Sequence, residues 1–356
     1  MIQKLKNTYI IAEIGVNHNG KISVAKKMIL AAKKCGADAV KFQSFKSENL
    51  VTKSAEQAPY QIRNTGKKEK QIKMLKNFEL KNDDYYTLKQ VCKKLKIDFI
   101  SSVFDEESAD FLCKYIKPKI IKIPSGEITN YFLLKKLDFN KNIILLSTGM
   151  SNYKEIVTAL NTIAKQKVFT LTQKSKINIV NKKIFLKIKK KICLMHCVTD
   201  YPVSYNYANL ECVRRFGKDF KLIIGYSDHT KGTLAPIIAI SKGAKIIEKH
   251  FTLNKKSRGP DHLASLNPVE FKKMVNDIRL GEKMFGDGVK KLENCEIINS
   301  KVARKSLVAK KNISLNEKFS YANVTAKRPW TGLNPFNIIN LINKKAKKNY
   351  LKDDII

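Results

Sequence analysis

Short β-branched and apolar runs alternate with longer amphipathic stretches along most of this chain. Eight apolar runs predict strands, at residues 8–14, 38–43, 97–102, 119–123, 142–147, 190–197, 220–225 and 244–249. Several of them are almost continuously apolar, as in Ile143-Ile144-Leu145-Leu146. Such runs are typical of parallel strands that are covered on both faces.

Helical periodicity occupies the stretches between these strands. It predicts helices near residues 22–35, 83–95, 105–115, 130–137, 152–165, 207–216 and 232–241, and an eighth at 268–283. Eight strand–helix units in succession predict an α/β fold, a (β/α)8 or TIM barrel. A doubly wound open sheet is the alternative arrangement of the same units.

Two segments interrupt the alternation. Residues 44–80 form a long polar excursion after the second strand, on the side of the barrel where active sites lie. Residues 166–190 precede the sixth strand, which places them at the opposite face, so we expect no catalytic role for them.

The turn cluster Phe285-Gly286-Asp287-Gly288 ends the barrel pattern. We therefore expect a barrel domain at 1–285, a linker at 286–305 that is charged and helical over 289–304, and a small module at 306–356. Strands are predicted in that module at 306–309 and 324–329. About 50 residues bury little core alone, so we expect the module to dock on another surface.

Composition narrows the choice of partners. No apolar run is long enough to span a bilayer, and seven residues precede the first strand, so we expect a cytoplasmic protein without a membrane partner. The seven cysteines form no Cys-x-x-Cys pair and indicate reduced thiols. The net charge of +38 comes from lysines scattered over nearly every helix, which indicates solvated faces rather than a nucleic-acid interface. A positive field would also attract an anionic substrate.

Two histidines follow successive apolar runs, in Gly225-Tyr226-Ser227-Asp228-His229 and in Ile246-Ile247-Glu248-Lys249-His250. Neutral imidazoles that converge from neighbouring strand ends suit a divalent metal. Hydrogen-bonded structural histidines are the alternative. A Gly-Pro turn then presents Asp261 and His262 on the same side.

Two lysines, Lys41 and Lys122, lie inside apolar strands, where a charge is costly unless it is paired. With nearby hydroxyls they predict a pocket for a phosphate or carboxylate. These hydroxyls belong to Ser102, Ser125, Ser147 and Ser227. The alternatives are that the lysines extend to water, or that Lys122 forms a Schiff base.

Taken together, the strand ends resemble the sialic acid synthase family over nearly the whole chain. The motifs that carry the resemblance are Ala12-Glu13-Ile14-Gly15-Val16-Asn17-His18-Asn19-Gly20, Val40-Lys41-Phe42-Gln43, Lys122-Ile123-Pro124-Ser125-Gly126-Glu127, Leu146-Ser147-Thr148-Gly149-Met150, Gly225-Tyr226-Ser227-Asp228-His229, Glu248-Lys249-His250-Phe251-Thr252 and Gly259-Pro260-Asp261-His262. The C-terminal module looks like that family's antifreeze-like (SAF) domain.

The resemblance implies a synthase that condenses phosphoenolpyruvate with an N-acylmannosamine-type sugar and releases phosphate. We expect N-acetylneuraminate synthase acting on N-acetylmannosamine. The alternative is legionaminic acid synthase acting on 2,4-diacetamido-2,4,6-trideoxymannose. The family pattern assigns a divalent ion, Mn²⁺ or Mg²⁺, to His229 and His250. It assigns the catalytic carboxylate to Glu13, with Glu127 as a second candidate.

The same pattern implies the substrate contacts. Phosphoenolpyruvate would be held by Lys41, Lys122, Ser102, Ser125, Ser147 and Ser227. The remaining substrate-binding residues would be Gln43, Phe104, Tyr201, Asp261 and Arg328. Arg328 would reach the barrel of the partner subunit in a domain-swapped homodimer.

Three departures from the family pattern leave the sugar open: Trp330-Thr331-Gly332 in place of Gly-Asn-Gly, Ser102-Val103 in place of Thr-Pro, and Thr199-Asp200 after the sixth strand. Two functions of other classes compete with the synthase. They are a metal-dependent hydrolase on the same barrel and a basic nucleic-acid-binding module.

Overall fold

The computed structural model describes residues 5–173 and 176–356. The chain separates into two compact units, Met1–Phe285 and Gly286–Ile356, and each is described by itself.

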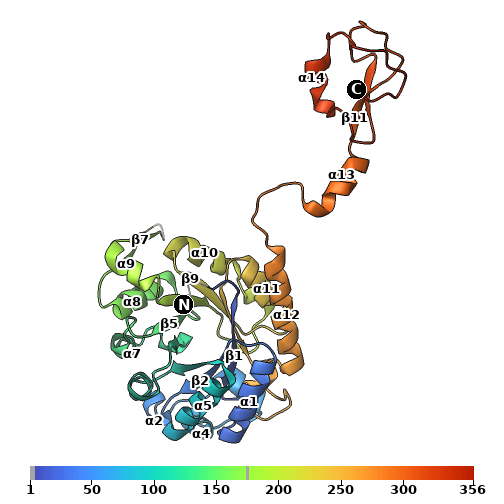
Figure 1. Cartoon of the computed structure of the whole chain (residues 1–356). Coiled ribbons are helices and arrows are strands. Elements are labelled where there is room, and N and C mark those ends of the chain that lie inside the picture. The colour runs from blue at the N-terminus through green and yellow to red at the C-terminus, as the bar shows by residue number, and fades with distance from the viewer. Residues whose placement is uncertain (1–4, 174–175) are drawn as a thin grey trace. The chain divides into compact units, whose positions relative to one another are not determined.

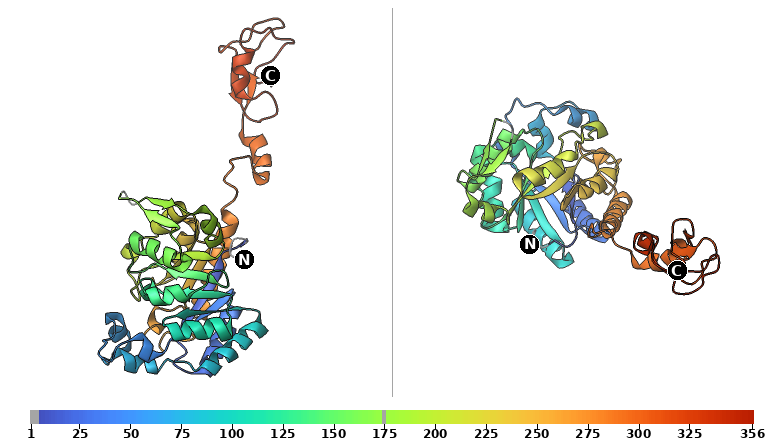
Figure 2. Two further views of the ribbon diagram at one scale, coloured as in Figure 1. Left: turned by 90° about the vertical axis from the view of Figure 1, so that its left-hand side faces the viewer. Right: turned by 90° about the horizontal axis from the view of Figure 1, so that it is seen from above.

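Eight parallel strands of the first unit close into a barrel (Figures 1 and 2). Around the barrel their order is β1-β10-β9-β8-β5-β4-β3-β2, which confirms the predicted (β/α)8 fold and excludes an open sheet. Each strand lies within three residues of its predicted position. They are β1 (Tyr9–Gly15), β2 (Ala39–Ser44), β3 (Asp98–Val103), β4 (Ile120–Ile123), β5 (Ile143–Ser147), β8 (Ile192–His196), β9 (Ile223–Asp228) and β10 (Ile246–His250).

Helices cover the outside of the barrel. They are α1 (Ile22–Lys34), α5 (Asn82–Leu95), α6 (Glu106–Phe111) with a π-helical turn at Leu112–Ile116, α7 (Tyr131–Lys136), α8 (Tyr153–Ala164), α10 (Glu211–Phe220), α11 (Leu234–Ser241) and α12 (Pro268–Met284). The predicted helix at 207–216 was placed too early. A 3₁₀ turn at Tyr205–Tyr207 comes first, and Asn209 has a φ of 41°, which a right-handed helix cannot contain.

Apolar side chains fill the half of the barrel interior that lies toward the amino ends of the strands. Ile11, Ile100, Leu145, Met195 and Ile246 belong to this inner cluster, and all are fully buried. A Cβ at position 225 would lie 2.2 Å from Met195 Sδ, so a larger residue there would displace the buried Met195 side chain. Because this amino-terminal half of the interior is packed, space for a substrate remains toward the carboxyl ends of the strands.

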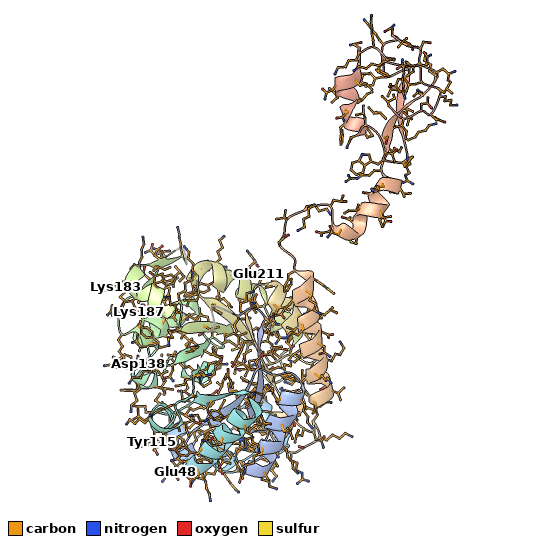
Figure 3. The ribbon with its side chains drawn as sticks, viewed as in Figure 1. Glu48, Tyr115, Asp138, Lys183, Lys187 and Glu211 are labelled. Carbon is orange, nitrogen blue, oxygen red and sulfur yellow. The ribbon has the colours of Figure 1, made fainter. Side chains whose placement is uncertain are left out.

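The segment after β2 folds into three short helices, α2 (Ser47–Leu50), α3 (Pro59–Thr65) and α4 (Gln71–Lys76). An apolar cluster that includes Phe45 and Met74 packs it against the barrel. The segment before β8 forms a hairpin, β6 (Phe169–Leu171) with β7 (Ile177–Ile179), followed by α9 (Lys182–Ile188). Lys183 and Lys187 of α9 project outward from the barrel, as expected of solvated charge (Figure 3).

The second unit is built around an antiparallel pair, β11 (Ser306–Ala309) with β12 (Val324–Lys327). It also contains η6 (Asn294–Glu296), α13 (Ile297–Ala303), η7 (Pro335–Asn337) and α14 (Ile338–Leu341). The predicted strand at 324–329 is two residues too long, since Pro329 has no N–H to donate. The predicted helical linker is helical only from Asn294 to Ala303.

The second unit has its own small core of Leu307, Ala309, Ile313, Phe319, Val324 and Ala346. Its assignment as an SAF domain stays a prediction. Across both units, no helix among the described residues has the length and apolar character needed to cross a membrane.

Candidate active site

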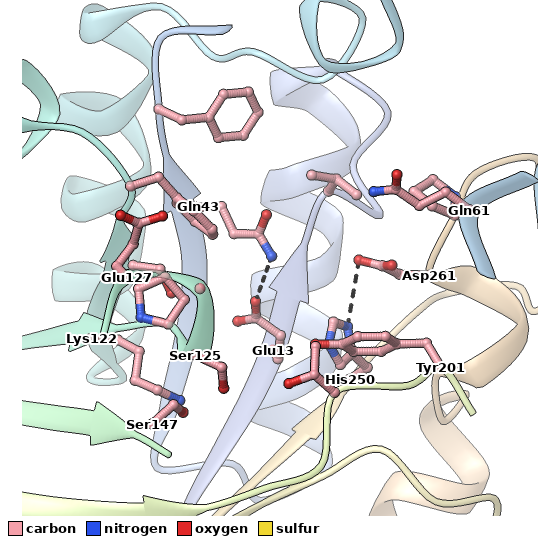
Figure 4. A pocket seen from close by; sticks show the side chains of 18 of the residues that line it. Glu13, Gln43, Gln61, Lys122, Ser125, Glu127, Ser147, Tyr201, His250 and Asp261 are labelled. Carbon is pink, nitrogen blue, oxygen red and sulfur yellow. Dashed lines mark hydrogen bonds and ion pairs between the residues drawn. The ribbon is translucent and has the colours of Figure 1, made fainter. Parts of the chain in front are cut away.

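A pocket of about 310 Å³ opens at the carboxyl ends of the barrel strands (Figure 4). Every site residue predicted within the barrel lines it: Glu13, Lys41, Gln43, Ser102, Phe104, Lys122, Ser125, Glu127, Ser147, Tyr201, Ser227, His229, His250 and Asp261. Residues at alternate positions of a strand face the same side, so the parallel strands aim these groups at one space.

The two strand lysines are buried and paired. Lys41 Nζ lies 2.9 Å from Glu13 Oε2 and donates to Ser102 Oγ at 2.9 Å. Lys122 Nζ donates to both carboxylate oxygens of Glu248, at 2.8 and 2.9 Å. The alternative that the lysines extend to water is therefore wrong. A Schiff-base lysine must reach a substrate carbonyl with a free amine, whereas the Lys122 amine is engaged by both carboxylate oxygens of Glu248.

Glu248 is the charged group that the sequence interpretation left without a role. It is buried, accepts a hydrogen bond from Ser227 Oγ at 2.8 Å, and lies 3.7 Å from Lys41 Nζ. Burial opposes its ionisation, but the charges of Lys122 and Lys41 outweigh burial and lower its pKa to about 2. Strand periodicity was the available signal, since Glu248 lies two residues before His250 on the same face.

Glu13 is also buried, but it holds its proton more tightly than Glu248 does. Its Oε1 accepts a hydrogen bond from Gln43 Nε2 at 3.1 Å. Burial raises the pKa of Glu13 to about 7; the Lys41 ammonium opposes this, and the nearby charge of Glu248 adds to it. A carboxyl group of this kind can exchange a proton near neutral pH.

Glu127 lies at the pocket edge, where it is half-buried and accepts a hydrogen bond from Asn130 Nδ2 at 2.7 Å. Burial raises the pKa of this carboxyl group as well. Glu127 has no partner lysine among the described residues, in contrast to Glu13. Glu127 is therefore less closely tied to the lysines of the pocket than Glu13 is, which favours Glu13 as the catalytic carboxyl group.

The two histidine rings face each other with centroids 5.6 Å apart. His229 Nδ1 lies 2.7 Å from the Val198 carbonyl oxygen, which can only accept, so Nδ1 carries the proton and Nε2 keeps its lone pair. His250 Nδ1 is buried without a hydrogen-bond partner and lies 3.8 Å from Asp261 Oδ2. Burial lowers the pKa of both imidazoles, that of His229 to about 4, so both are neutral at pH 7.

This geometry fits a divalent ion. Two neutral imidazoles come from adjacent strand ends, and one buried ring nitrogen has no partner. Within residues 5–173 and 176–356, no group of three or more His, Cys, Asp and Glu side chains is arranged to hold a metal. His229 and His250 would thus be the protein ligands, with the other positions left for water and substrate.

Tyr201 and Asp261 form the wall beside the histidines. The Tyr201 ring centroid lies 4.2 Å from that of His229 and 5.5 Å from that of His250. Asp261 is buried, and burial raises its pKa to about 6. Asn64 Nδ2 of α3 donates to the Tyr201 and Pro260 carbonyl oxygens, at 3.2 and 2.7 Å, which fastens the segment after β2 over this wall.

The side of the pocket that carries Lys122, Ser125 and Ser147, predicted to bind the anion, is closely packed around Ser125. Its Oγ accepts a hydrogen bond from Gly149 N at 3.1 Å, and a Cβ at position 149 would lie 2.4 Å from Thr199 Oγ1. The Thr199 hydroxyl lines the pocket, and it is buried without a hydrogen-bond partner. Thr199 was noted in the sequence only as a departure from the family pattern.

Arg328 belongs to the second unit, so its contact with a sugar stays a prediction. Its Nε donates to the Ala303 carbonyl oxygen at 2.8 Å, and its side chain is exposed. Trp330-Thr331-Gly332 is the motif that differs from the family pattern after Arg328 and Pro329. In it, the centroid of the Trp330 ring lies 4.9 Å from the Arg304 guanidinium. Thr331 N and Gly332 N both donate to Ser306 Oγ, which fixes this loop to β11.

Comparison with known proteins gives the same assignment. Residues 28–290 match the NeuB family. The chain is 44% identical over 352 residues to N,N'-diacetyllegionaminic acid synthase of Campylobacter jejuni, covering 99% of both chains. It is 39% identical over 341 residues to the protein of that name from Legionella pneumophila, covering 96% of this chain and 91% of that one. Among solved structures, the chain is similar to N-acetylneuraminic acid (sialic acid) synthetase from Leptospira borgpetersenii, crystallised in complex with citrate. The TM-score is 0.66 and the sequence identity is 30%, and the match covers 83% of this chain and 90% of that one. The resemblance seen in the sequence is confirmed, and this chain belongs to the NeuB family.

Proposed function

We propose that this protein condenses phosphoenolpyruvate with 2,4-diacetamido-2,4,6-trideoxymannose to give N,N'-diacetyllegionaminate and phosphate. The sequence interpretation ranked N-acetylneuraminate first and this reaction second. The 44% and 39% identical relatives, both named for the legionaminic acid reaction, favour the reverse order. The observation that carries the reaction class is one pocket in which two lysines and four serines face two neutral imidazoles.

The lysines and serines bind the anionic donor. Lys41 and Lys122 present ammonium groups in a buried site where charge–charge interactions are strong. Glu13 and Glu248 already balance these two charges. A divalent ion at His229 and His250 would supply positive charge for the donor and Lewis acidity that polarises the sugar aldehyde.

Glu13 acts on the water of the second step. C3 of the enol donor attacks the aldehyde carbon, which leaves cationic character at C2. Water adds to C2, the bond from C2 to the phosphate oxygen breaks, and phosphate leaves; the second proton of the water neutralises the alkoxide left by the aldehyde, so a ketone and a hydroxyl group result. Glu13 accepts the proton of this water, which suits a carboxyl group whose pKa burial raises to about 7.

The sugar choice is supported by an apolar wall. The strand ends supply the polar lining, whereas the segment after β2 supplies Phe45, Leu50, Val51, Met74 and Phe78. With the aldehyde at an ion held by the histidines, the far end of the sugar would face this wall. A C6 methyl group gains free energy from burial there, whereas an unpaired hydroxyl costs about 1–3 kcal/mol.

The competing functions have less support. A hydrolase of the usual zinc type takes three protein ligands, and the described part of the chain offers no such group. A hydrolase also gives no reason for two buried lysines. The nucleic-acid alternative needs concentrated arginine and aromatic residues, whereas the charge here is dispersed lysine.

A substrate panel tests the proposal. The purified protein is incubated with Mn²⁺, phosphoenolpyruvate and each of the two sugars, and phosphate and product mass are measured. We expect phosphate release to require donor and sugar together, and the diacetamido sugar to give the higher kcat/KM. A higher kcat/KM with N-acetylmannosamine would support the N-acetylneuraminate alternative, and phosphate release without any sugar would refute the synthase.

A further inference from the structure

A buried ion pair lies directly behind the two histidines. Lys249 precedes His250 in β10, and Asp228 precedes His229 at the end of β9. The two residues are register partners in the barrel wall. Lys249 Nζ lies 2.5 Å from Asp228 Oδ2, and neither side chain has any exposed surface.

The pair is part of a closed hydrogen-bond network. Asp228 Oδ1 accepts hydrogen bonds from the Tyr226 hydroxyl at 3.0 Å and from Thr230 N at 2.8 Å. Lys249 Nζ also donates to the Thr230 carbonyl oxygen. The ammonium group of β10 is therefore bonded to the residues on both sides of His229.

The network does not touch the pocket. Asp228, Lys249 and Tyr226 are absent from its lining, whereas Ser227, His229, Glu248 and His250 line it. This division follows from the alternation of side chains along a strand. Any effect of the pair on the reaction must therefore act through its strand neighbours in the pocket, which include the histidine that follows each member.

Stability alone explains the pair poorly. Burying two charges costs desolvation free energy, and an apolar pair of similar size is often as stable or more so. A charged pair does, however, fix geometry, because both partners must stay in contact to avoid a lone buried charge. Here the geometry that it fixes is the spacing of two neighbouring strand ends.

We infer that Asp228 and Lys249 are positioning residues that set the spacing of the His229 and His250 imidazoles for a divalent ion. The inference rests on the metal site of the proposed function. The pair joins β9 to β10 one residue before each histidine, and Thr230 anchors the far side of His229. Val198 and Val203 also hold His229, through its ring and its carbonyl oxygen, and Ser227 Oγ lies 3.4 Å from its Nε2, but none of these contacts joins β9 to β10.

The test measures Mn²⁺ affinity directly, from the signal of free Mn²⁺ in electron paramagnetic resonance, beside the melting temperature. The variants are Lys249→Met, Asp228→Asn and their combination, which leaves no lone buried charge. Tyr226→Phe is milder, because it removes only one hydrogen bond to Asp228. Loss of a partner that orients a metal ligand weakens metal binding about 10- to 100-fold, which is the result expected for the charge variants.

Matched controls lie at the opposite end of the barrel. The Tyr9 hydroxyl donates to Asp98 Oδ2 at 2.7 Å, so Tyr9→Phe removes a comparable bond. Arg279 pairs with Asp38 at 3.1 Å, so Arg279→Met breaks an ion pair there. We expect both controls to lower the melting temperature without changing Mn²⁺ affinity, whereas Tyr226→Phe weakens Mn²⁺ binding.

The outcomes separate the two proposals. Wild-type Mn²⁺ affinity in Tyr226→Phe and in the double variant would overturn the positioning role and leave the metal site standing. An equal loss of affinity in the Tyr9 and Arg279 controls would also overturn it, since the effect would then follow general stability. If the wild-type protein bound no Mn²⁺, the metal site would be refuted, and the positioning role with it.

Discussion

Neighbouring charges decide the chemistry of single buried residues in this pocket. Glu13 and Glu248 are both buried carboxyl groups near Lys41. Glu248 also receives both hydrogen bonds of Lys122, and its pKa falls to about 2, whereas burial raises that of Glu13 to about 7. Two carboxyl groups pushed apart in this way suit different tasks, a fixed counter-charge and a proton acceptor.

The metal ligands give the first prediction. We expect His229→Ala and His250→Ala each to abolish Mn²⁺ binding and metal-dependent turnover, because these two would be the protein ligands of the proposed ion. Turnover is measured after chelation and after Mn²⁺ is restored. His196→Ala is the control, since His196 Nε2 bonds to the Ala208 carbonyl oxygen at 2.9 Å outside the pocket lining. Turnover that survives in either site variant would refute the ligand assignment.

The carboxyl groups give the second prediction. We expect Glu13→Gln to lower kcat by about 10²- to 10⁴-fold, the usual contribution of general acid–base catalysis. The KM for phosphoenolpyruvate should change little, because glutamine keeps the size of the side chain. Glu127→Gln, at the pocket edge, should lose much less. A larger loss of kcat at Glu127 than at Glu13 would reverse the two roles.

At the scale of elements, the segment after β2 lines the end of the pocket that we propose for the sugar. Its helices are short, and side-chain contacts hold them in place: Glu79 accepts hydrogen bonds from Ser47 N and Oγ at 3.0 and 2.8 Å. Asn64 fastens α3 to the loops after β8 and β10. The segment therefore belongs to the binding site although it adds no strand to the barrel.

Leu50 of α2 gives the third prediction. Leu50 lines the apolar wall and is half-buried. We expect Leu50→Gln to reduce the ratio of kcat/KM between the diacetamido sugar and N-acetylmannosamine, because the amide offers a partner to the C6 hydroxyl. A ratio change of about 10-fold corresponds to about 1.4 kcal/mol. Leu186→Gln on α9, outside the pocket lining, is the control. An unchanged ratio would show that the wall does not select the sugar.

At the scale of the whole molecule, the predicted site residues are divided between the two units. The barrel carries the residues proposed to bind the metal and the donor, while Arg328 belongs to the second unit. A small module of this kind gains stability by docking. We expect a homodimer in which Arg328 of one chain serves the barrel of the other.

Mixing two inactive variants gives the fourth prediction. In an Arg328→Ala/His250→Ala heterodimer, one barrel retains both histidines and receives an intact Arg328 from the other chain. Random reassembly of equal amounts should therefore restore about a quarter of the wild-type sites, a consequence of two-fold symmetry. Activity is measured after joint unfolding and refolding. No recovery beyond the sum of the separate variants would exclude the exchanged arrangement.

The strands could be predicted well because each is a short apolar run with polar ends. In a parallel barrel all carboxyl ends meet at one rim, so strand order along the chain was enough to group Glu13, Lys41, Lys122, Ser147 and His250. The start of α10 was misplaced, because the positive φ of Asn209 leaves only a weak trace in the sequence. Element boundaries depend on such local turns more than on periodicity.

The sequence by itself determined the fold class, the family and the residues that gather at the strand ends. Only the tertiary structure decided which of these residues pair. Lys122 and Glu248 are 126 positions apart, and closure of the barrel brings them together. Strand alternation separates Glu248 and His250 from Lys249, but only the structure shows that the first two face the pocket and that Lys249 is buried against Asp228 behind it. The physical reason is that hydrophobic periodicity is local along the chain, whereas pairing and burial of charge depend on which segments meet in space.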